Sequence, residues 1–234
     1  MLLIFFILRW NESQRVKFIK YEAFGIEIPD GYDMHGIDVS RYQQSIGWKQ
    51  VQEMNVGNIS IDFAFIKATE GETLTDPYFK RNWKEAQKAN VTRGVYHFFS
   101  PTGDAIKQAQ FFIKQVKLQP GDLPPVLDIE TIGTVPVLVL QAKAKIWLQM
   151  VESYYGVKPI IYTNADFYNK YLGEDFDEYP LWVAHYYEKH KPRINRNWNF
   201  WQHNDRGNVD GISAKVDFNV FNGDSLDFAH LLIK

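Results

Sequence analysis

The apolar run Pro125–Glu130 (PVLDIE) ends in two carboxylates, Asp128 and Glu130, with one residue between them. Residues two apart on a strand point to the same face, with Cα atoms roughly 6.5–7 Å apart at about 3.3 Å rise per residue. Like charges held that close raise the pKa of one acid, which then keeps a proton near neutral pH and can donate it to a leaving oxygen. Carboxylate pairs of this kind carry out glycoside cleavage.

More acids fall within or at the end of predicted strands, among Val, Ile, Leu and Phe: they are Asp38, Glu70 and Asp217. In a parallel barrel the chemistry is assembled from side chains at the carboxyl ends of the strands and from the loops that follow. Acids in apolar strands are costly to bury. A solvated strand end or a structural ion pair explains any one of these acids, but it is a poor explanation for several acids together.

The histidines suggest a rival site. His35, His97, His185 and His203 also fall in predicted strands and, with Asp38 or Asp217, could surround a divalent metal, as in a barrel metallohydrolase. No His-x-His or His-Glu-x-x-His pair occurs, so hydrogen-bonded strand-end histidines are the more ordinary interpretation and we expect no metal. The chain also lacks a Gly-x-Gly-x-x-Gly or Walker pattern, which argues against a nucleotide cofactor.

Short β-branched and aromatic runs alternate with helical patterns, which predicts βα units around a parallel sheet. The predicted strands are His35–Ser40, Phe63–Thr69, Gly94–Phe99, Pro125–Glu130, Pro159–Thr163, Leu181–Tyr186, Phe200–His203 and Lys215–Phe221. Helices are predicted from Asp76 as N-cap (Phe79, Trp83 and Ala86 inward), from about Asp104 (Ile106, Ala109, Ile113 and Val116 on one stripe), from about Thr134 (Leu140, Ala144, Trp147 and Val151 inward), over Trp48–Met54 and over Ala165–Tyr171. Eight strands and about five helices, with loops joining the last three strands, predict a single-domain α/β fold, an irregular TIM-like (β/α)5(β)3 barrel.

The composition is globular. With 26 Lys and Arg against 28 Asp and Glu in 234 residues, the net charge of −2 and the lack of a basic block argue against a nucleic-acid-binding protein. No cysteine is present, which excludes disulfides and thiolate chemistry. The 7 Trp, 13 Tyr and 17 Phe suit a carbohydrate site, although core packing is the usual fate of a single ring.

Residues 1–34 are expected to form an apolar leader and a connecting segment, with the barrel over residues 35–234. The run Met1–Leu8 (MLLIFFIL) is too short to span a bilayer and lacks a preceding basic region and a cleavage site. We interpret it as part of an export signal or membrane tether, the alternative being an ordinary buried strand. This predicts an exported protein of the periplasm, cell envelope or exterior.

Several motifs recur in a familiar order and spacing: HGIDVSRYQ at 35–43, FIKATEG at 65–71, RGVYHFF at 93–99, PVLDIE at 125–130, IIYTN at 160–164, LWVAHY at 181–186, and VDGI with KVDFNVFNG at 209–223. Together they resemble the glycoside hydrolase family 25 lysozymes over about Gly36–Leu232. The resemblance implies an irregular barrel of eight strands and five helices. It also implies hydrolysis of the β-1,4 bond between N-acetylmuramic acid and N-acetylglucosamine in peptidoglycan glycan strands. We expect no cofactor and, for a single barrel that acts on a polymer, a monomer.

Carried over position by position, the resemblance implies that Glu130 is the general acid and Asp128 the second catalytic carboxylate. Asp38 and Asp217 match the other two acids that line the site. Substrate contacts are implied for Tyr162, Trp182 and Trp201 as rings or pocket walls, and for His97, His185 and Gln202 as polar groups. For the second step, the 2-acetamido carbonyl of the substrate could attack the anomeric carbon, or a carboxylate could activate water.

Three classes of function follow from these observations: a muramidase, a barrel that binds glycan without cutting it, and a metal-dependent barrel hydrolase. The chitinases, which also end a strand in Asp-x-Glu, are disfavoured because their further acids are replaced here by Leu123 and Val126. The charged stretch Glu188–Arg196 is interpreted either as a solvated loop or as a rim that selects among peptide-substituted glycans.

Overall fold

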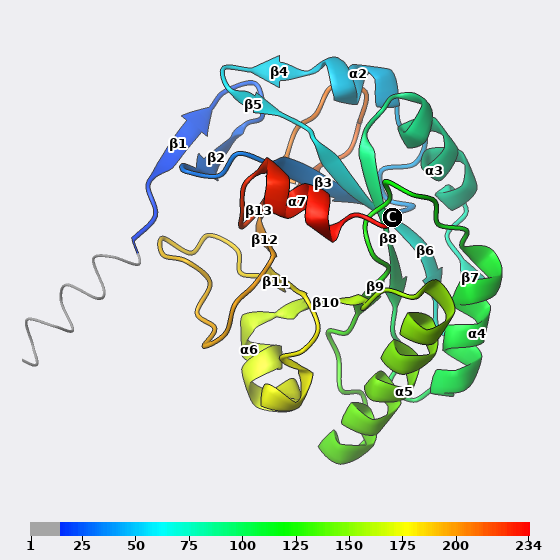
Figure 1. Ribbon diagram of the computed structural model, residues 1–234. Helices are drawn as coiled ribbons and strands as arrows, with labels where there is room; N and C mark the ends of the chain where they lie inside the picture. The colour runs from blue at the N-terminus through cyan, green and yellow to red at the C-terminus, as the bar shows by residue number, and fades with distance from the viewer. Residues whose placement is uncertain (1–14) are drawn as a thin grey trace, which may run out of the picture.

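The computed structural model describes residues 15–234, in which a closed eight-stranded barrel forms the centre (Figure 1). Its strands are β3 (His35–Val39), β6 (Phe63–Glu70), β8 (Thr92–Phe98), β9 (Val126–Asp128), β10 (Ile160–Asn164), β11 (Leu181–Ala184), β12 (Phe200–Gly207) and β13 (Val216–Phe221). All eight predicted strands are therefore present. The single-domain α/β barrel predicted from the sequence is confirmed.

The strand order is β3-β13-β12-β11-β10-β9-β8-β6, and the pairing of β3 with β6 closes the barrel. Neighbouring strands from β6 to β12 run parallel, as do β3 and β6. Strand β13 is antiparallel to both of its neighbours, β12 and β3, which differs from the parallel sheet expected. The reason is that a short loop joins β12 to β13, and a parallel return would need a crossover of a dozen or more residues.

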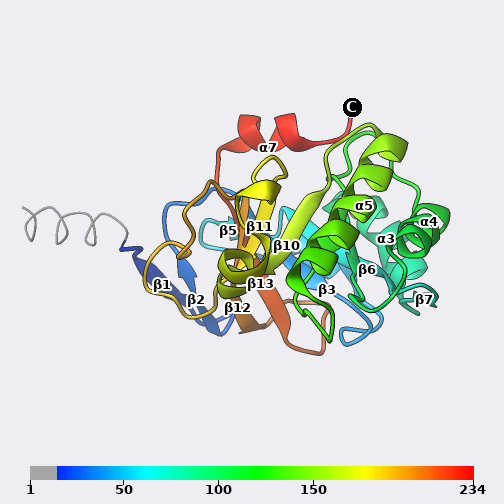
Figure 2. The same ribbon diagram turned by 90° about the horizontal axis from the view of Figure 1, so that it is seen from below.

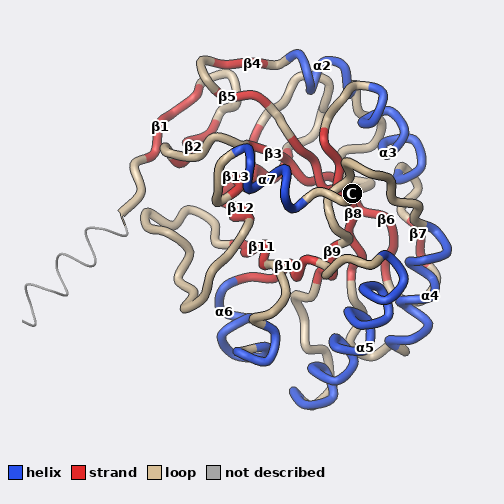
Figure 3. Tube along the Cα trace, in the orientation of Figure 1, coloured by secondary structure: helices blue, strands red, loops and turns tan. Residues whose placement is uncertain are grey.

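Helices lie around one side of the barrel, while hairpins and loops cover the other (Figure 3). The helices are α2 (Trp48–Glu53), α3 (Phe79–Lys88), α4 (Ala105–Gln115), α5 (Val137–Tyr155), α6 (Ala165–Phe167) and α7 (Ser225–Leu231), with a π turn at Tyr168–Leu172 and a 3-10 turn at Glu174–Phe176. The shorter strands are β1 (Phe18–Tyr21), β2 (Ile26–Pro29), β4 (Asn55–Val56), β5 (Ile59–Ser60) and β7 (Leu74–Thr75). The five predicted helices are present, whereas the sequence patterns did not indicate α7 or these short strands.

Two details of the predicted helices are wrong. Helix α3 begins at Phe79, two residues later than an N-cap at Asp76 predicts, although one Asp76 oxygen accepts the N–H of Tyr78 at 2.9 Å as an N-cap would; the other oxygen accepts the N–H of Arg41 at 2.8 Å. In α4, Asp104 is the N-cap as expected, but Ile106 is 47% exposed. The inward stripe of α4 begins one residue earlier and consists of Ala105, Gln108, Ala109 and Phe112.

The N-terminal part of the described chain packs against the barrel. Strands β1 and β2 form an antiparallel hairpin. Phe24, Ile26 and Ile28 of this hairpin are buried in the layer outside the barrel, where the Phe24 ring contacts Phe218 of β13. The predicted leader Met1–Leu8 lies outside the described residues.

Aromatic rings plug the end of the barrel opposite the carboxyl ends of its parallel strands. Phe63, Phe200 and Phe221 point inward there, and Phe228 of α7 lies 5.1–6.4 Å from each of their ring centroids. Figure 2 shows α7 set apart from the other helices, across this end. Gly36 makes room for the plug, because a Cβ at this position would lie 2.4 Å from the Phe63 ring. The plug leaves the opposite end for polar side chains.

Candidate active site

Four carboxylates, Asp38, Asp128, Glu130 and Asp217, gather at the polar end of the barrel, and we call them the carboxylate cluster. Strand periodicity places them there, because Asp38 on β3 lies directly opposite Asp217 on β13. Across the barrel, Asp128 ends β9 with Glu130 two residues further on. The structure thus brings together all four acids that the sequence nominated as catalytic.

Asp38 is buried but well supplied with donors. Its Oδ2 accepts hydrogen bonds from the side-chain amides of Gln202 at 2.7 Å and Asn219 at 2.8 Å. Burial raises the pKa of Asp38 to about 6, against the effect of these two bonds, which lower it. Asp38 is therefore ionised at neutral pH and carries a fixed negative charge in the site.

Asp217 behaves differently although it faces Asp38. Burial, and after it the negative charge of Asp38, raises the pKa of Asp217 to about 9. Like charges on directly opposite strand positions repel each other, and a shared proton relieves the repulsion. Asp38 and Asp217 therefore form a pair that holds one proton, on the Asp217 side, at neutral pH.

Asp128 differs from Asp38 in its hydrogen bonding. Its Oδ1 is buried and has no hydrogen-bond partner among residues 15–234. Burial raises the pKa of Asp128, and the neighbouring Glu130 raises it further. A buried polar atom without a partner is rare in folded proteins, and at the mouth of a barrel it is suited to a group supplied by a ligand.

One amide network joins the cluster to two tyrosines. The hydroxyls of Tyr162 and Tyr186 both donate to Oε1 of Gln202, at 2.7 and 2.6 Å, while Nε2 of Gln202 donates to Asp38. Two donors on one oxygen fix the orientation of the Gln202 amide, so its nitrogen must face the carboxylate. Burial raises the pKa of both tyrosines, which keeps their hydroxyls protonated as donors.

Trp182 lies beneath this network. It is 2% exposed, its ring stacks on Phe65 at 4.2 Å, and its Nε1 donates to Oδ1 of Asn219 at 2.7 Å. Asn219 in turn donates to Asp38. The structure therefore places Trp182 as a buried support for Asp38, inside the barrel but under the surface that a sugar could reach.

Two predicted contact residues point away from the cluster, which corrects their expected placement. His97 is fully buried outside the barrel, where its ring stacks on Trp147 and bonds Thr69 and Gln108. Trp201 is also fully buried, packed against Phe18, and its Nε1 donates to the carbonyl of His185. The physical reason is the strand period of two: neighbours of the inward residues Tyr96 and Gln202 must face outward.

His185, another predicted contact residue, belongs to the loop that follows β11. Its Nε2 lies 3.4 Å from Glu188, a buried carboxylate that also pairs with His190 at 3.2 Å and Arg193 at 2.6 Å. The charged stretch 188–196 is thus partly held by an internal ion-pair centre rather than being wholly solvated.

Two inward residues of the site were missed by sequence reasoning. Asn219 lies two residues after Asp217 on β13, and Tyr186 lies four after Trp182, so the same strand period would have found both. Within residues 15–234, no group of three or more His, Asp or Glu side chains is arranged to hold a metal ion.

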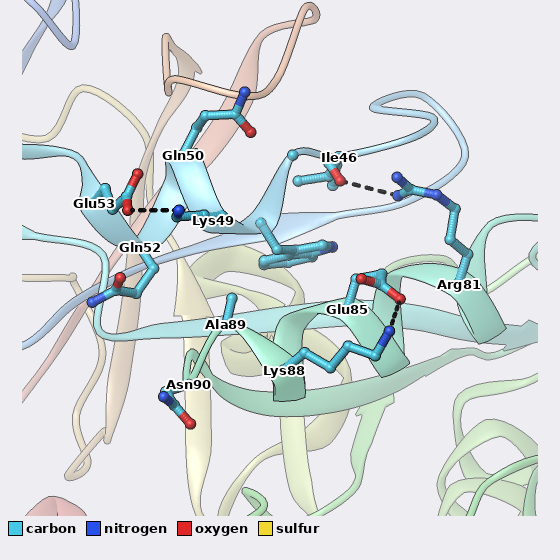
Figure 4. Close-up of a pocket in the computed structure, with 12 residues that line it drawn as sticks. Ile46, Lys49, Gln50, Gln52, Glu53, Arg81, Glu85, Lys88, Ala89 and Asn90 are labelled. Carbon is cyan, nitrogen blue, oxygen red and sulfur yellow. Dashed lines mark hydrogen bonds and ion pairs between the residues drawn. The ribbon is translucent and has the colours of Figure 1, made fainter.

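A separate pocket of about 450 Å³ lies between α2 and α3 (Figure 4). Its charged side chains are mostly paired, as in Lys88 with Glu85 at 2.8 Å and Lys49 with Glu53 at 3.6 Å. Arg81 donates to the carbonyl of Ile46. No member of the carboxylate cluster lines this pocket, so we assign the chemistry to the barrel mouth.

Comparison with known proteins decides the family. The family model described as "Glycosyl hydrolases family 25" matches residues 37–212 of this chain. The chain belongs to glycosyl hydrolases family 25. The resemblance seen in the motifs is thereby confirmed, and the protein is a glycoside hydrolase.

Relatives of this family 25 chain are found in several bacteria. The uncharacterized protein YegX of Escherichia coli K12 is 50% identical over 202 residues, covering 86% of this chain and 74% of YegX. Lysozyme M1 of Streptomyces globisporus is 34% identical over 209 residues, covering 83% of this chain and 69% of the lysozyme. The solved structure of a family 25 glycosyl hydrolase from Bacillus anthracis is 31% identical, with a TM-score of 0.80 over 91% of this chain and 99% of that one.

Proposed function

We propose that this family 25 hydrolase is a muramidase that cleaves the β-1,4 bond between N-acetylmuramic acid and N-acetylglucosamine in peptidoglycan. Support comes from relatives named lysozyme or muramidase, including Lysozyme M1. The observation that carries the proposal is the buried oxygen of Asp128, beside Glu130 at the barrel mouth, for which residues 15–234 provide no hydrogen-bond partner. The 2-acetamido N–H group of the substrate is a donor that would satisfy this oxygen.

In the first step, Glu130 donates its proton to the glycosidic oxygen as the bond between that oxygen and the anomeric carbon breaks. The acetamido carbonyl oxygen attacks the anomeric carbon from the other face, and Asp128 holds the acetamido nitrogen in place. Asp38, ionised at neutral pH, adds a negative charge that stabilises the positive charge developing on the sugar ring.

In the second step, water attacks the anomeric carbon, the bond from the acetamido oxygen breaks, and the proton released by water returns to Glu130. Two displacements at the same carbon retain the anomeric configuration. An NMR spectrum of the first product formed would therefore show the β anomer before mutarotation, whereas an initial α anomer would mean direct attack by activated water.

The decisive experiment compares the wild type with Glu130→Gln on purified peptidoglycan, using mass spectrometry of the released fragments. We expect new reducing-end N-acetylmuramic acid from the wild type, and a loss of at least about 100-fold in Glu130→Gln without a change in thermal unfolding. Glu53→Gln, which changes an exposed side chain of α2, serves as a matched control and should cleave like the wild type.

Other outcomes would redirect the assignment. Full activity of Glu130→Gln would remove this residue from the acid role, and reducing-end N-acetylglucosamine would change the bond cleaved. Binding of muropeptides without release of fragments would favour a glycan-binding barrel. Inactivation by EDTA with rescue by zinc would favour a metal-dependent hydrolase.

We also propose that the protein acts outside the cytoplasm, as a monomer. The proposed substrate lies there, and the run Met1–Leu8 has the composition of an export signal or tether. Among the helices of residues 15–234, none is long and apolar enough to cross a bilayer. Sequencing the N-terminus of protein recovered from the cell envelope, together with light scattering of the purified enzyme, tests both statements.

A further inference from the structure

A β-bulge on β6 brings Lys67 and Glu70 to the same side of the sheet. The register with β8 pairs Lys67 with Tyr96 but Thr69 with His97, so one extra residue is inserted between Lys67 and Thr69. Residues three apart on a regular strand face opposite sides, whereas the extra residue turns Glu70 back to the side of Lys67. The two side chains form an ion pair with 2.7 Å between Nζ and Oε2.

This ion pair holds the Lys67 ammonium at the barrel mouth. The Lys67 side chain is only 12% exposed, and its Nζ lies 4.6 Å from the centre of the Phe98 ring. Phe98 stands directly opposite Asp128 in the register of β8 with β9. The bulge and Glu70 therefore hold a cation on β6 against the Phe98 ring, which neighbours Asp128, and β8 is the one strand between β6 and β9.

Charged and titratable groups surround Asp128 from every neighbouring element. Acids are contributed by the segment after β9 (Glu130), β3 (Asp38), β13 (Asp217) and β6 (Glu70), hydroxyls by β8 (Tyr96), β10 (Tyr162) and the loop after β11 (Tyr186), and the cation by β6 (Lys67). Burial and Glu130 raise the pKa of Asp128, and Lys67 lowers it. Without Lys67, the site would contain acids that all oppose the ionisation of Asp128.

We propose that Lys67 is a positioning residue for Asp128, held by the bulge, Glu70 and Phe98, and that its charge opposes the effects of burial and Glu130 and so favours the anionic form of Asp128 that binds the acetamido N–H. This inference rests on the proposed function for the role of Asp128. Lys67 itself does not contact the reacting atoms. It acts through Asp128, and Glu70 serves to hold it rather than to transfer a proton.

The test compares pH profiles of kcat/KM on soluble glycan fragments for the wild type, Lys67→Met and Lys67→Arg. Removing the cation should move the acidic limb of the profile upward by about one pH unit, which is about a tenfold loss below the limb. Arginine keeps the charge and should restore the limb. The matched control is Lys88→Met, which breaks a similar lysine–glutamate pair on α3 and should leave the profile unchanged (Figure 4).

A second readout needs no substrate. Carbon-13 NMR of the Asp128 carboxyl should show a titration midpoint about one unit higher in Lys67→Met than in the wild type. If the wild type released no fragments from peptidoglycan, the proposed function would be wrong. The titration would still show whether Lys67 controls the charge of Asp128. Should Lys67→Met not fold, Lys67→Gln provides the same comparison.

Two results would overturn the inference. Identical Asp128 titrations in the wild type and the neutral variants would show that Lys67 does not control the charge of Asp128. A higher KM with an unmoved acidic limb would show that Lys67 binds the substrate directly.

Discussion

Replacing Asp217 with Asn is expected to reduce the loss of folding stability that the protein suffers as the pH rises above neutral. The Asp217 carboxyl faces Asp38 across the β3–β13 ladder, and its pKa is raised to about 9 by burial and by that negative charge. In the unfolded chain the same group ionises near pH 4. The folded state therefore binds a proton that the unfolded state releases, and stability falls as the pH rises between these two values.

The magnitude follows from the one proton by which the folded and unfolded states differ. Because the folded state binds one proton more, raising the pH from about 6.5 to about 8.5 lowers the unfolding free energy by about 2.7 kcal/mol. Asp217 is partly exposed, so screening by water reduces this to about 1.4 kcal/mol. The buried histidines do not affect the comparison. Burial lowers the pKa of His97 and His203 to about 3, so both are neutral in the folded state, and their proton uptake in the unfolded chain near pH 6.5 is the same in both proteins and cancels.

The assay is guanidinium unfolding followed by tryptophan fluorescence at several pH values in this window, for the wild type and Asp217→Asn. The difference in unfolding free energy between the two proteins should grow by about 1.4 kcal/mol from the lower to the higher pH, at unchanged m-value. Asp175→Asn, an exposed carboxylate paired with Lys145, is the matched control and should follow the wild type. Parallel curves for the wild type and Asp217→Asn would refute the reasoning.

Two further predictions concern stability away from the cluster. His203→Phe should stabilise the protein in acid, because neither ring nitrogen of buried His203 has a partner within residues 15–234 and its lowered pKa means that only the unfolded chain takes up a proton below about pH 6.5. The gain should be about 2 kcal/mol at pH 5 relative to pH 7.5, read from denaturation midpoints, and an equal change at both pH values would contradict it. Phe228→Ala should lower the unfolding free energy by about 3 kcal/mol by opening the plug, while peptidoglycan cleavage at 25 °C is retained, since the plug and the cluster lie at opposite ends of the barrel. A loss of turnover in folded Phe228→Ala would show that the two ends are coupled.

Sequence patterns predicted the eight strands because each strand is a short apolar run bounded by polar turns. They also predicted which acids meet, since the carboxyl ends of parallel strands share one end of a barrel. Which residues of each strand face the inside of the barrel was predicted less well. Trp201 and Gln202 are neighbours on β12 and cannot both face the site. Applying the strand period of two on every strand would have taken Trp201 and His97 off the list of predicted substrate contacts.

Other features had no local signal. The β6 bulge lies where β6 pairs with β8, just before its end also pairs with β7, and no residue type in FIKATE marks the extra position. Helix α7 lies across the plug because Phe228 meets rings from β6, β12 and β13, which are far apart in the sequence. Such contacts are set by the closed barrel and become visible only when the strands are assembled.

The two ends of the barrel explain how the cluster can exist at all. Buried acids that repel one another destabilise the folded chain, and each raised pKa in the cluster measures part of that cost. The interlocked rings of Phe63, Phe200 and Phe221 at the opposite end stabilise the same strands, so the destabilisation can be carried without local unfolding of the site. It follows that variants which weaken the plug should unfold more readily at high pH while Asp217 is present. Asp217→Asn should therefore restore part of the free energy of unfolding that Phe228→Ala removes.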